Sequence, residues 1–242
     1  MDVYGVGIAM ATARELEQLR QSCEADLRIA VDAARHHHPR VGFDFFAVNQ
    51  QPDHALLVEA EEADLVVVGS NGLGATKNFL LGTVLGTVLH QSPCPVAVVP
   101  PELHASTGRI VVGVDGSESS SAALLWAADE AARSSADLCV VHAWEYPYGF
   151  TNEGLGRGMA FAEVDAGIVL EKAVDLARDR MTGTVVGELI EGGPTQALLD
   201  TSTTADLIIV GSRGRGGFRS MLLGSVAQAV SARAQCPVVV VR

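Results

Sequence analysis

The feature that most constrains the fold of this chain is an internal repeat. The segment ADLVVVGSNG at residues 63–72 returns as ADLIIVGSRG at residues 205–214. The shift of 142 residues holds without a gap through residues 52–99 and 194–241, where almost half of the aligned positions are identical. Two copies are too few to stack as a solenoid, so the repeat predicts a tandem duplication of one globular domain.

The second copy alternates between short apolar runs and longer amphipathic ones. The apolar runs predict buried strands at residues 109–115, 137–144, 184–190, 206–210 and 237–241. Helical patterns fall between them at residues 119–133, 161–181, 194–201 and 224–234, with a glycine-rich loop at 146–158. This alternation predicts an α/β fold with a parallel sheet and right-handed crossovers. Aromatic residues make up only 5% of the chain, which leaves aliphatic side chains to build such a core.

The first copy matches the second only from its second helix onward. Thr12 and Glu15 form a capping box for a helix that runs to about residue 36. A strand at 41–48, a helix at 52–62 and strands at 65–68 and 96–99 are then expected.

Two strands and a helix have no counterpart in the first copy, because Met1 aligns with Ala143. The apolar burial lost with two central strands exceeds the stability of a typical domain, about 5–15 kcal/mol. We therefore expect either that the natural chain starts upstream or that the first copy depends on the second. The predicted organisation is a partial domain at 1–100, a linker at 101–108 and a complete domain at 109–242.

Both copies carry a glycine loop between a predicted strand and a predicted helix. It reads GSRGRGGFRSMLLGS at residues 211–225 and GSNGLGATKNFLLGT at residues 69–83. Glycines let backbone amides approach an anion closely, and a helix N-terminus adds free N–H groups and a favourable dipole. Arg213 and Arg215 are placed to meet a phosphate tail. The alternative is a tight strand-to-helix turn that requires glycine without binding anything.

The glycine loop, the opening RIVVGVDGS and the ending CPVVVV closely resemble the universal stress protein family. The resemblance covers the whole second copy and the first from near its second helix. It implies two flavodoxin-like (Rossmann-like) five-stranded sheets of order 3-2-1-4-5, the first lacking strands 1 and 2. The fifth strands, near 96–99 and 238–241, would pair antiparallel and join the copies into a pseudo-dimer, with a homodimer as a further expected assembly. In this family the spacing Gly-x2-Gly-x9-Gly-Ser/Thr marks members that bind ATP.

The resemblance also assigns roles to individual residues of the second copy. Asp115 would contact the adenosine, and the backbone of Ala143 would contact adenine, while Asp115 could instead be a turn or cap residue ahead of Ser117. The expected nucleotide-binding residues are Gly113, Val114, Asp115, Gly116, Ser117, Ala143, Gly211, Ser212, Arg213, Gly214, Arg215, Gly224, Ser225 and Val226. The expected ligand is ATP, with Mg²⁺ as an optional companion.

The first copy departs from this pattern and is the weaker candidate for nucleotide binding. Its matching residues are Gly69, Gly72, Gly82 and Thr83. It has no counterpart of Asp115 or of the second strand, and Asn71 and Leu73 replace the two arginines. Such a loop can still hold a phosphate, but we do not expect it to enclose adenine.

Charge, hydropathy and cysteine content limit the partners and the cellular compartment that we expect for this chain. A formal net charge of −12 disfavours nucleic acid. No apolar run is long enough to span a membrane, and we expect a cytoplasmic protein without a membrane partner. The run of residues 36–38, three histidines, is interpreted as a solvated helix end rather than a metal site. Cys94 and Cys236 both precede proline, and we interpret them as small buried residues rather than a redox pair.

The resemblance to the universal stress protein family implies a nucleotide-dependent regulator of a stress response. One alternative is a slow ATPase, although hydrolysis needs a group that orients water near the terminal phosphate. Ser212, Ser220 and Ser225 are hydrogen-bond donors rather than bases, so no catalytic residue is assigned and no metal ligand is named. A second alternative is an interaction module that does not use nucleotide.

Overall fold

The structure is a computed structural model of the chain that describes residues 13–70, 82–145, 155–215 and 223–242. The chain divides into two units, Met1–Gln51 and Pro52–Arg242. No helix in the described ranges combines the length and the apolar character that crossing a membrane requires.

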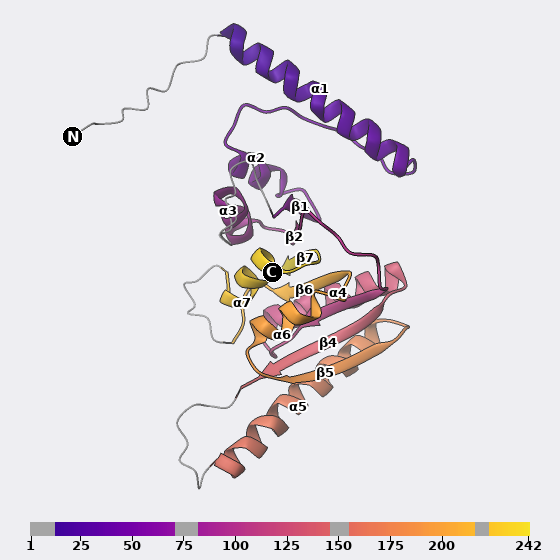
Figure 1. Ribbon diagram of the computed structural model, residues 1–242, viewed down its shortest axis with the longest axis vertical. Helices are drawn as coiled ribbons and strands as arrows, with labels where there is room; N and C mark the ends of the chain where they lie inside the picture. The colour runs from indigo at the N-terminus through magenta and orange to yellow at the C-terminus, as the bar shows by residue number, and fades with distance from the viewer. Residues whose placement is uncertain (1–12, 71–81, 146–154, 216–222) are drawn as a thin grey trace, which may run out of the picture. The chain divides into compact units, whose positions relative to one another are not determined.

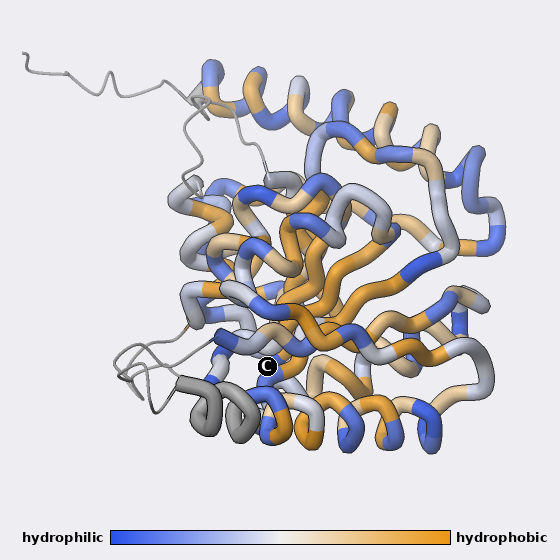
Figure 2. The backbone as a smooth tube through the Cα atoms, turned by 60° about the horizontal axis from the view of Figure 1, so that its bottom comes forward, coloured by the Kyte–Doolittle hydropathy of each residue, from blue (hydrophilic) through white to orange (hydrophobic). Residues whose placement is uncertain are grey.

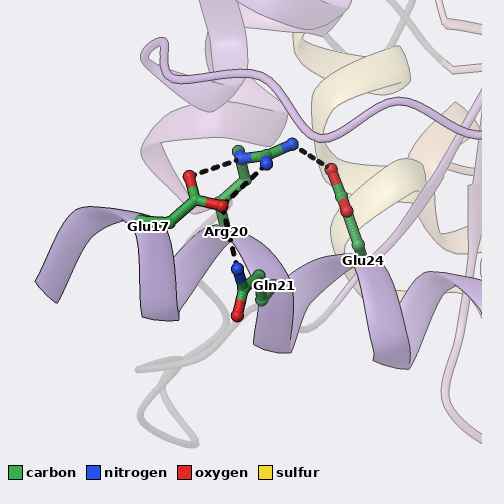
Figure 3. Close-up of polar contacts among 4 residues, drawn as sticks. All are labelled: Glu17, Arg20, Gln21 and Glu24. Atoms are coloured by element: carbon green, nitrogen blue, oxygen red, sulfur yellow. Dashed lines mark hydrogen bonds and ion pairs between the residues drawn. The ribbon is translucent and has the colours of Figure 1, made fainter. Parts of the chain in front are cut away.

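The first unit contains one long helix, α1 (Ala13–His37). Arg20 reaches both Glu17, at 2.8 Å, and Glu24, at 2.5 Å, and Gln21 donates a further hydrogen bond to Glu17 (Figure 3). Residues three or four positions apart lie on the same side of a helix, so this cluster supports the helix along its exposed surface. Thr12, the first residue of the expected capping box, lies outside the described residues.

The second unit contains one seven-stranded sheet of order β1-β2-β7-β6-β3-β4-β5 (Figure 1). Its strands are β1 (Val66–Gly69), β2 (Val96–Val99), β3 (Arg109–Gly113), β4 (Asp137–Trp144), β5 (Val185–Glu191), β6 (Leu207–Gly211) and β7 (Val238–Val241). Its helices are α2 (Pro52–Glu59), α3 (Thr83–Gln91), α4 (Glu118–Ser134), α5 (Leu155–Arg180), α6 (Pro194–Thr201) and α7 (Ser225–Arg233).

The five strands of the second copy are parallel to one another and follow the expected order 3-2-1-4-5. Alternate residues of each strand enter two different cores, because successive side chains point to opposite faces of a sheet. Ile209 packs in the core under α4 and α5, whereas Ile208 packs in the core under α6 and α7. Figure 2 shows the hydrophobic strands running through the middle of this unit. Both faces of the sheet are therefore covered, as for a parallel sheet.

The two copies do not form two separate sheets, as the resemblance had implied, but share one mixed sheet. The last strands β2 and β7 pair antiparallel, with Val96 opposite Val240, Ala97 opposite Val239 and Val98 opposite Val238. Ala97 and Val239 are themselves equivalent under the 142-residue shift, so the pairing has an approximate two-fold axis at this position. The joining of the copies through their last strands, expected from the resemblance, is present.

The predicted strand at residues 41–48 is wrong, because the structure has no strand there. The pattern still alternates, with Phe43 and Phe45 partly buried and Asp44 and Phe46 exposed. In the second copy the matching strand, β5, is held by hydrogen bonds to β4. The described residues of the first copy contain no counterpart of β4, and a strand without a partner leaves its backbone groups unpaired.

One loop prediction also needs correction. The glycine-rich loop was expected over residues 146–158, but α5 already begins at Leu155. Glycine costs about 1 kcal/mol in a helix interior relative to alanine, which a long helix tolerates. Residues 146–154 lie outside the described part of the chain.

The segment ahead of β3 is held by the carboxylate of Asp206. Its oxygens accept hydrogen bonds from the amides of Thr107, at 2.6 Å, and Gly108, at 2.7 Å, and from the hydroxyl of Ser106, at 2.7 Å. Burial opposes the charged carboxylate, yet these hydrogen bonds outweigh it and lower the pKa of Asp206. Asp206 thus fixes the start of β3 beside the start of β6.

Candidate functional site

A cavity of about 370 Å³ opens at the carboxyl ends of β3, β4 and β6. The first residues of α6 and α7 form its other side. Strand order reverses between β3 and β6, and open α/β sheets bind ligands at such a switch point. Eleven of the expected nucleotide-binding residues line the cavity: Gly113, Val114, Asp115, Ala143, Gly211, Arg213, Gly214, Arg215, Gly224, Ser225 and Val226.

Asp115 links the end of β3 to the glycine loop. Its Oδ1 accepts a hydrogen bond from the amide of Ser117, at 3.0 Å, and its Oδ2 accepts one from the amide of Arg215, at 2.7 Å. Burial opposes the charge on this carboxyl, but the hydrogen bonds from Ser117, Arg215 and Ser120 outweigh it and lower the pKa of Asp115. Asp115 is therefore an ionised acceptor at the edge of the cavity.

The start of α4 is also bonded to the glycine loop. Ser117 caps this helix by accepting a hydrogen bond from the amide of Ser120, at 3.2 Å, and its hydroxyl donates to the carbonyl of Arg213, at 3.4 Å. The amide of Arg213 in turn donates to the hydroxyl of Ser119, at 3.3 Å. These contacts hold the described part of the loop, residues 211–215, against α4.

Two glycines of the loop are required by close backbone approach. A Cβ atom at Gly211 would lie 2.7 Å from the backbone of Ser119, and one at Gly214 would lie 2.5 Å from Oδ2 of Asp115. Either side chain would force the loop away from α4 or from Asp115. Glycine at these positions is thus explained by packing within the protein, and the same packing brings the loop amides to the cavity.

The N-terminus of α7 supplies the electropositive part of the cavity. Gly224 is its N-cap and gives the helix no side-chain cap, while the Gly224 amide donates to the carbonyl of Ser212, at 2.7 Å. The first amides of a helix favour negative charge. Together with the guanidinium groups of Arg213 and Arg215, this end of the cavity suits an anion.

The cavity is also lined by residues that the sequence reasoning missed, most of them apolar. Those residues are Ser120, Val141, Pro194, Leu198, Val210 and Ala227. Val141 and Val210 belong to strands that were predicted, so strand alternation could have placed them near the site. His142 was also missed: it is buried, and its Nδ1 donates to the carbonyl of Val114, at 2.7 Å. This bond holds the segment between β3 and Asp115 in place.

Three expected residues of the second copy do not line the cavity. Gly116 lies in the turn ahead of α4, with φ of 77°, and Ser117 caps that helix. Ser212 is buried behind the loop. Their observed roles are structural.

The first copy does not assemble a comparable set of residues in its described part. Gly69 ends β1, Gly82 is the N-cap of α3 and Thr83 is the first residue of that helix. Gly72 lies outside the described residues. Gly69, Gly82 and Thr83 do not line the cavity at β3, β4 and β6.

The described residues contain no cluster of three His, Cys, Asp or Glu side chains that could hold a metal ion. His36 and His37 lie in the exposed last turn of α1.

Cys94 and Cys236 are buried, in agreement with the interpretation as small packed residues, and burial raises the pKa of Cys236 to about 12.

Residues 2–100 and 107–242 both match the universal stress protein family, and the chain belongs to this family, with two such segments in tandem. Universal stress protein Rv2005c of Mycobacterium tuberculosis is 37% identical over 199 residues, covering 76% of this chain and 63% of the relative. Universal stress protein Rv2623 of the same organism is 35% identical over 188 residues, with the same coverage. The chain thus spans less than two thirds of the length of these relatives.

Solved structures show the same fold. A universal stress protein from Archaeoglobus fulgidus superposes with a TM-score of 0.65 at 22% identity, covering 98% of this chain and 82% of its own. Universal stress protein UspA from Lactobacillus plantarum gives a TM-score of 0.52 at 23% identity, covering 57% of this chain and all of its own. These similarities establish the architecture and leave the ligand to be argued from the site.

Proposed function

We propose that the cavity of the second copy binds ATP and that the bound nucleotide makes this protein a regulator in a stress response. The observation that carries the proposal is the meeting of Asp115 with the glycine loop in one cavity. That cavity has an apolar part and an electropositive part, and ATP likewise has a base with flat aromatic faces and a charged phosphate chain.

The apolar part suits an adenine ring. Val114, Val141 and Leu198 line it, and the β4 residue Ala143 offers backbone groups near the cavity wall. Small-molecule sites are mostly apolar, with a few polar groups that fix orientation, and their volumes are about 300–1,000 Å³. The volume given above falls within this range, which supports a ligand of nucleoside size.

The polar part suits a ribose and phosphates. The ionised carboxylate of Asp115 can accept hydrogen bonds from ribose hydroxyls. Arg213, Arg215 and the amides at the start of α7 can share the phosphate charge. Mg²⁺, when bound to the phosphates, would neutralise part of the remaining charge, and the described residues assign it no protein ligand.

Calorimetry of the purified chain with ATP, adenosine and inorganic tripolyphosphate tests this proposal. We expect one ATP per chain, with both fragments binding more weakly than the whole nucleotide. The variant Gly224→Val should abolish binding, because its side chain would enter the space beside the carbonyl of Ser212, 3.3 Å from a Cβ at this position. Gly86→Ala, in open space on α3, is the matched control and should bind normally.

The outcomes separate the alternatives. The absence of ATP binding would favour the interaction module, and binding that persists in Gly224→Val would place the site elsewhere. Sustained phosphate release in the same samples would favour a slow ATPase over a purely regulatory protein.

A further inference from the structure

A cation follows β7 directly, next to the glycine loop of the second copy. Strands β6 and β7 run in parallel with Gly211 opposite Val241, and the amide of Ser212 donates to the carbonyl of Val241, at 2.7 Å. Arg242 is the next residue after Val241. The first residues of the loop and Arg242 therefore leave the sheet side by side, at the edge where the cavity opens.

The side chain of Arg242 lies on the same face of the sheet as α7. Successive residues of a strand point to opposite faces, and Val238 and Val240 pack in the core under α6 and α7. Arg242 continues this alternation, and its guanidinium donates to the carbonyl of Leu89, at 2.8 Å. Leu89 belongs to the last turn of α3 and packs in the same core. The Arg242 side chain is thus on the face from which the N-terminus of α7 meets the cavity.

The contact with α3 holds the guanidinium of Arg242 through one of its nitrogens. The carbonyls of the last turn of a helix carry partial negative charge, so a cation is favoured beside Leu89. A guanidinium has five N–H groups in a planar fork, and the bond to Leu89 uses only Nη2. The first copy therefore fixes the position of this cation and leaves the other N–H groups available to a ligand.

Arg242 and Arg213 are two neighbouring cations without a carboxylate partner. Burial and the positive charge of Arg213 both lower the pKa of Arg242, although a guanidinium remains charged at neutral pH. Within the described part of residues 52–242, neither arginine forms an ion pair with a carboxylate. Two like charges at close range repel each other, and an anion between them offsets this repulsion. The two guanidinium groups are therefore suited to share one anion.

We propose that Arg242 is a phosphate-binding residue of this site and that the first copy positions it through the carbonyl of Leu89. Arg242 does not line the cavity itself, so it does not contact the nucleoside. A phosphate chain that leaves the cavity past Arg213 meets Arg242 next, and the guanidinium binds the terminal phosphate. This inference rests on the proposed binding of ATP and adds to it a preference for the triphosphate.

Calorimetry of the full chain with adenosine, AMP, ADP and ATP tests the inference. Arg242→Gln removes the charge and keeps an amide that can donate a hydrogen bond. We expect this variant to bind ATP about tenfold more weakly than the native chain, because a charge-assisted hydrogen bond is lost. Its affinities for adenosine and AMP should stay unchanged, because neither ligand extends to Arg242. A variant that was merely misfolded would lose affinity for all four ligands.

Arg233→Gln is the matched control for the change in net charge. Arg233 also places a cation at the last turn of a helix, with its Nε 3.4 Å from the carbonyl of Ala229. It lies at the opposite end of α7 from Ser225, which lines the cavity. The variant should therefore bind ATP as the native chain does.

Arg242→Lys tests whether the contact with α3 matters. Lysine keeps the positive charge, but its single ammonium group lacks the planar fork that lets a guanidinium bridge Leu89 and a phosphate. We expect the affinity of this variant for ATP to lie between those of the native chain and Arg242→Gln. Full affinity for ATP in Arg242→Lys would overturn the positioning role of the first copy.

The results distinguish this inference from the proposed function. Absence of ATP binding in the native chain would overturn both. Equal affinity for ATP in the native chain and in Arg242→Gln would overturn the inference alone. A loss of adenosine affinity in Arg242→Gln as large as its loss of ATP affinity would do the same, because the effect would then not arise at the phosphates.

Discussion

The amide of Arg215 donates a hydrogen bond of 2.7 Å to Oδ2 of Asp115, a residue one hundred positions earlier in the chain. The bond joins the loop after β6 to the turn after β3, at the end of the two strands where the cavity opens. Because it uses a backbone donor and an ionised acceptor, its strength depends on the charge of Asp115 rather than on the arginine side chain.

Replacing Asp115 with alanine should weaken ATP binding about tenfold to a hundredfold, because a charged hydrogen-bond partner is worth roughly 1.5–3 kcal/mol. The loss has two parts, a missing acceptor for the ribose and a loop no longer held at Arg215. Isothermal calorimetry gives the affinity, and Asp137→Asn, at the exposed far end of β4, is the matched control. An unchanged affinity in Asp115→Ala would mean that the carboxylate serves only the turn.

Adding one methyl group to Gly211 should both destabilise the protein and impair the site. The new Cβ would lie 2.7 Å from the Ser119 backbone, and such overpacking costs about 1–3 kcal/mol. Gly86→Ala should instead stabilise by about 0.5–1 kcal/mol, since a helical glycine in open space gains from alanine. Urea denaturation of both variants measures the difference. Equal stabilities for the two variants would contradict the close approach of the loop to α4.

The hydrogen bonds that the Asp206 carboxylate accepts predict that the protein loses stability in acid. The folded-state pKa of this carboxyl lies below its ordinary value, so its contribution is complete above the unfolded pKa of about 3.9 and is lost as the pH falls through the folded value. Asp206→Asn should remove about 1–3 kcal/mol at neutral pH. It should also flatten the acid limb of the curve of unfolding free energy against pH. A variant whose acid limb matches that of the native chain would show that other carboxyls dominate there.

Thiol labelling should distinguish one cysteine from the other three. Cys23 is exposed on α1, whereas Cys94, Cys139 and Cys236 are buried, and burial raises the pKa of both Cys139 and Cys236. Since the thiolate is the reactive form, a thiol reagent at about pH 8 should label one site rapidly and the rest only on unfolding. Cys23→Ser should remove the rapid phase. Rapid labelling of Cys94 or Cys236 in the folded protein would mean that the paired strands β2 and β7, which follow these residues, separate readily.

Much of the second copy could be predicted because each of its elements has its partner within the chain. The predicted strand at 137–144 and helix at 194–201 coincide with β4 and α6. The strand predicted at 41–48 failed for the opposite reason: alternation shows which side chains could face a core, but a strand also needs a neighbour for its backbone. The resemblance implied that the last strands of the two copies pair, but it did not predict that all seven strands form one sheet.

The residues that directly follow the strand ends could be predicted as part of the candidate site. Those that reach the site through tertiary packing could not. The family resemblance predicted that Asp115, Gly214 and Ser225 belong to one site, and all three line the cavity. The apolar wall that Pro194 and Leu198 contribute was not foreseen, because α6 reaches the cavity only through tertiary packing. Nor could the sequence show that Ser117 caps α4 and that Ser212 is buried behind the loop, so that neither residue lines the cavity.

The approximate two-fold axis at Ala97 and Val239 has a consequence for how the protein responds to dilution. A self-complementary strand pair can also form between two separate molecules, in which case it dissociates as the concentration falls. Here a short connection ties both halves together, so the local concentration of each strand around the other is fixed by the tether. The pairing of β2 with β7 between the copies should therefore persist at concentrations where an untethered dimer would dissociate.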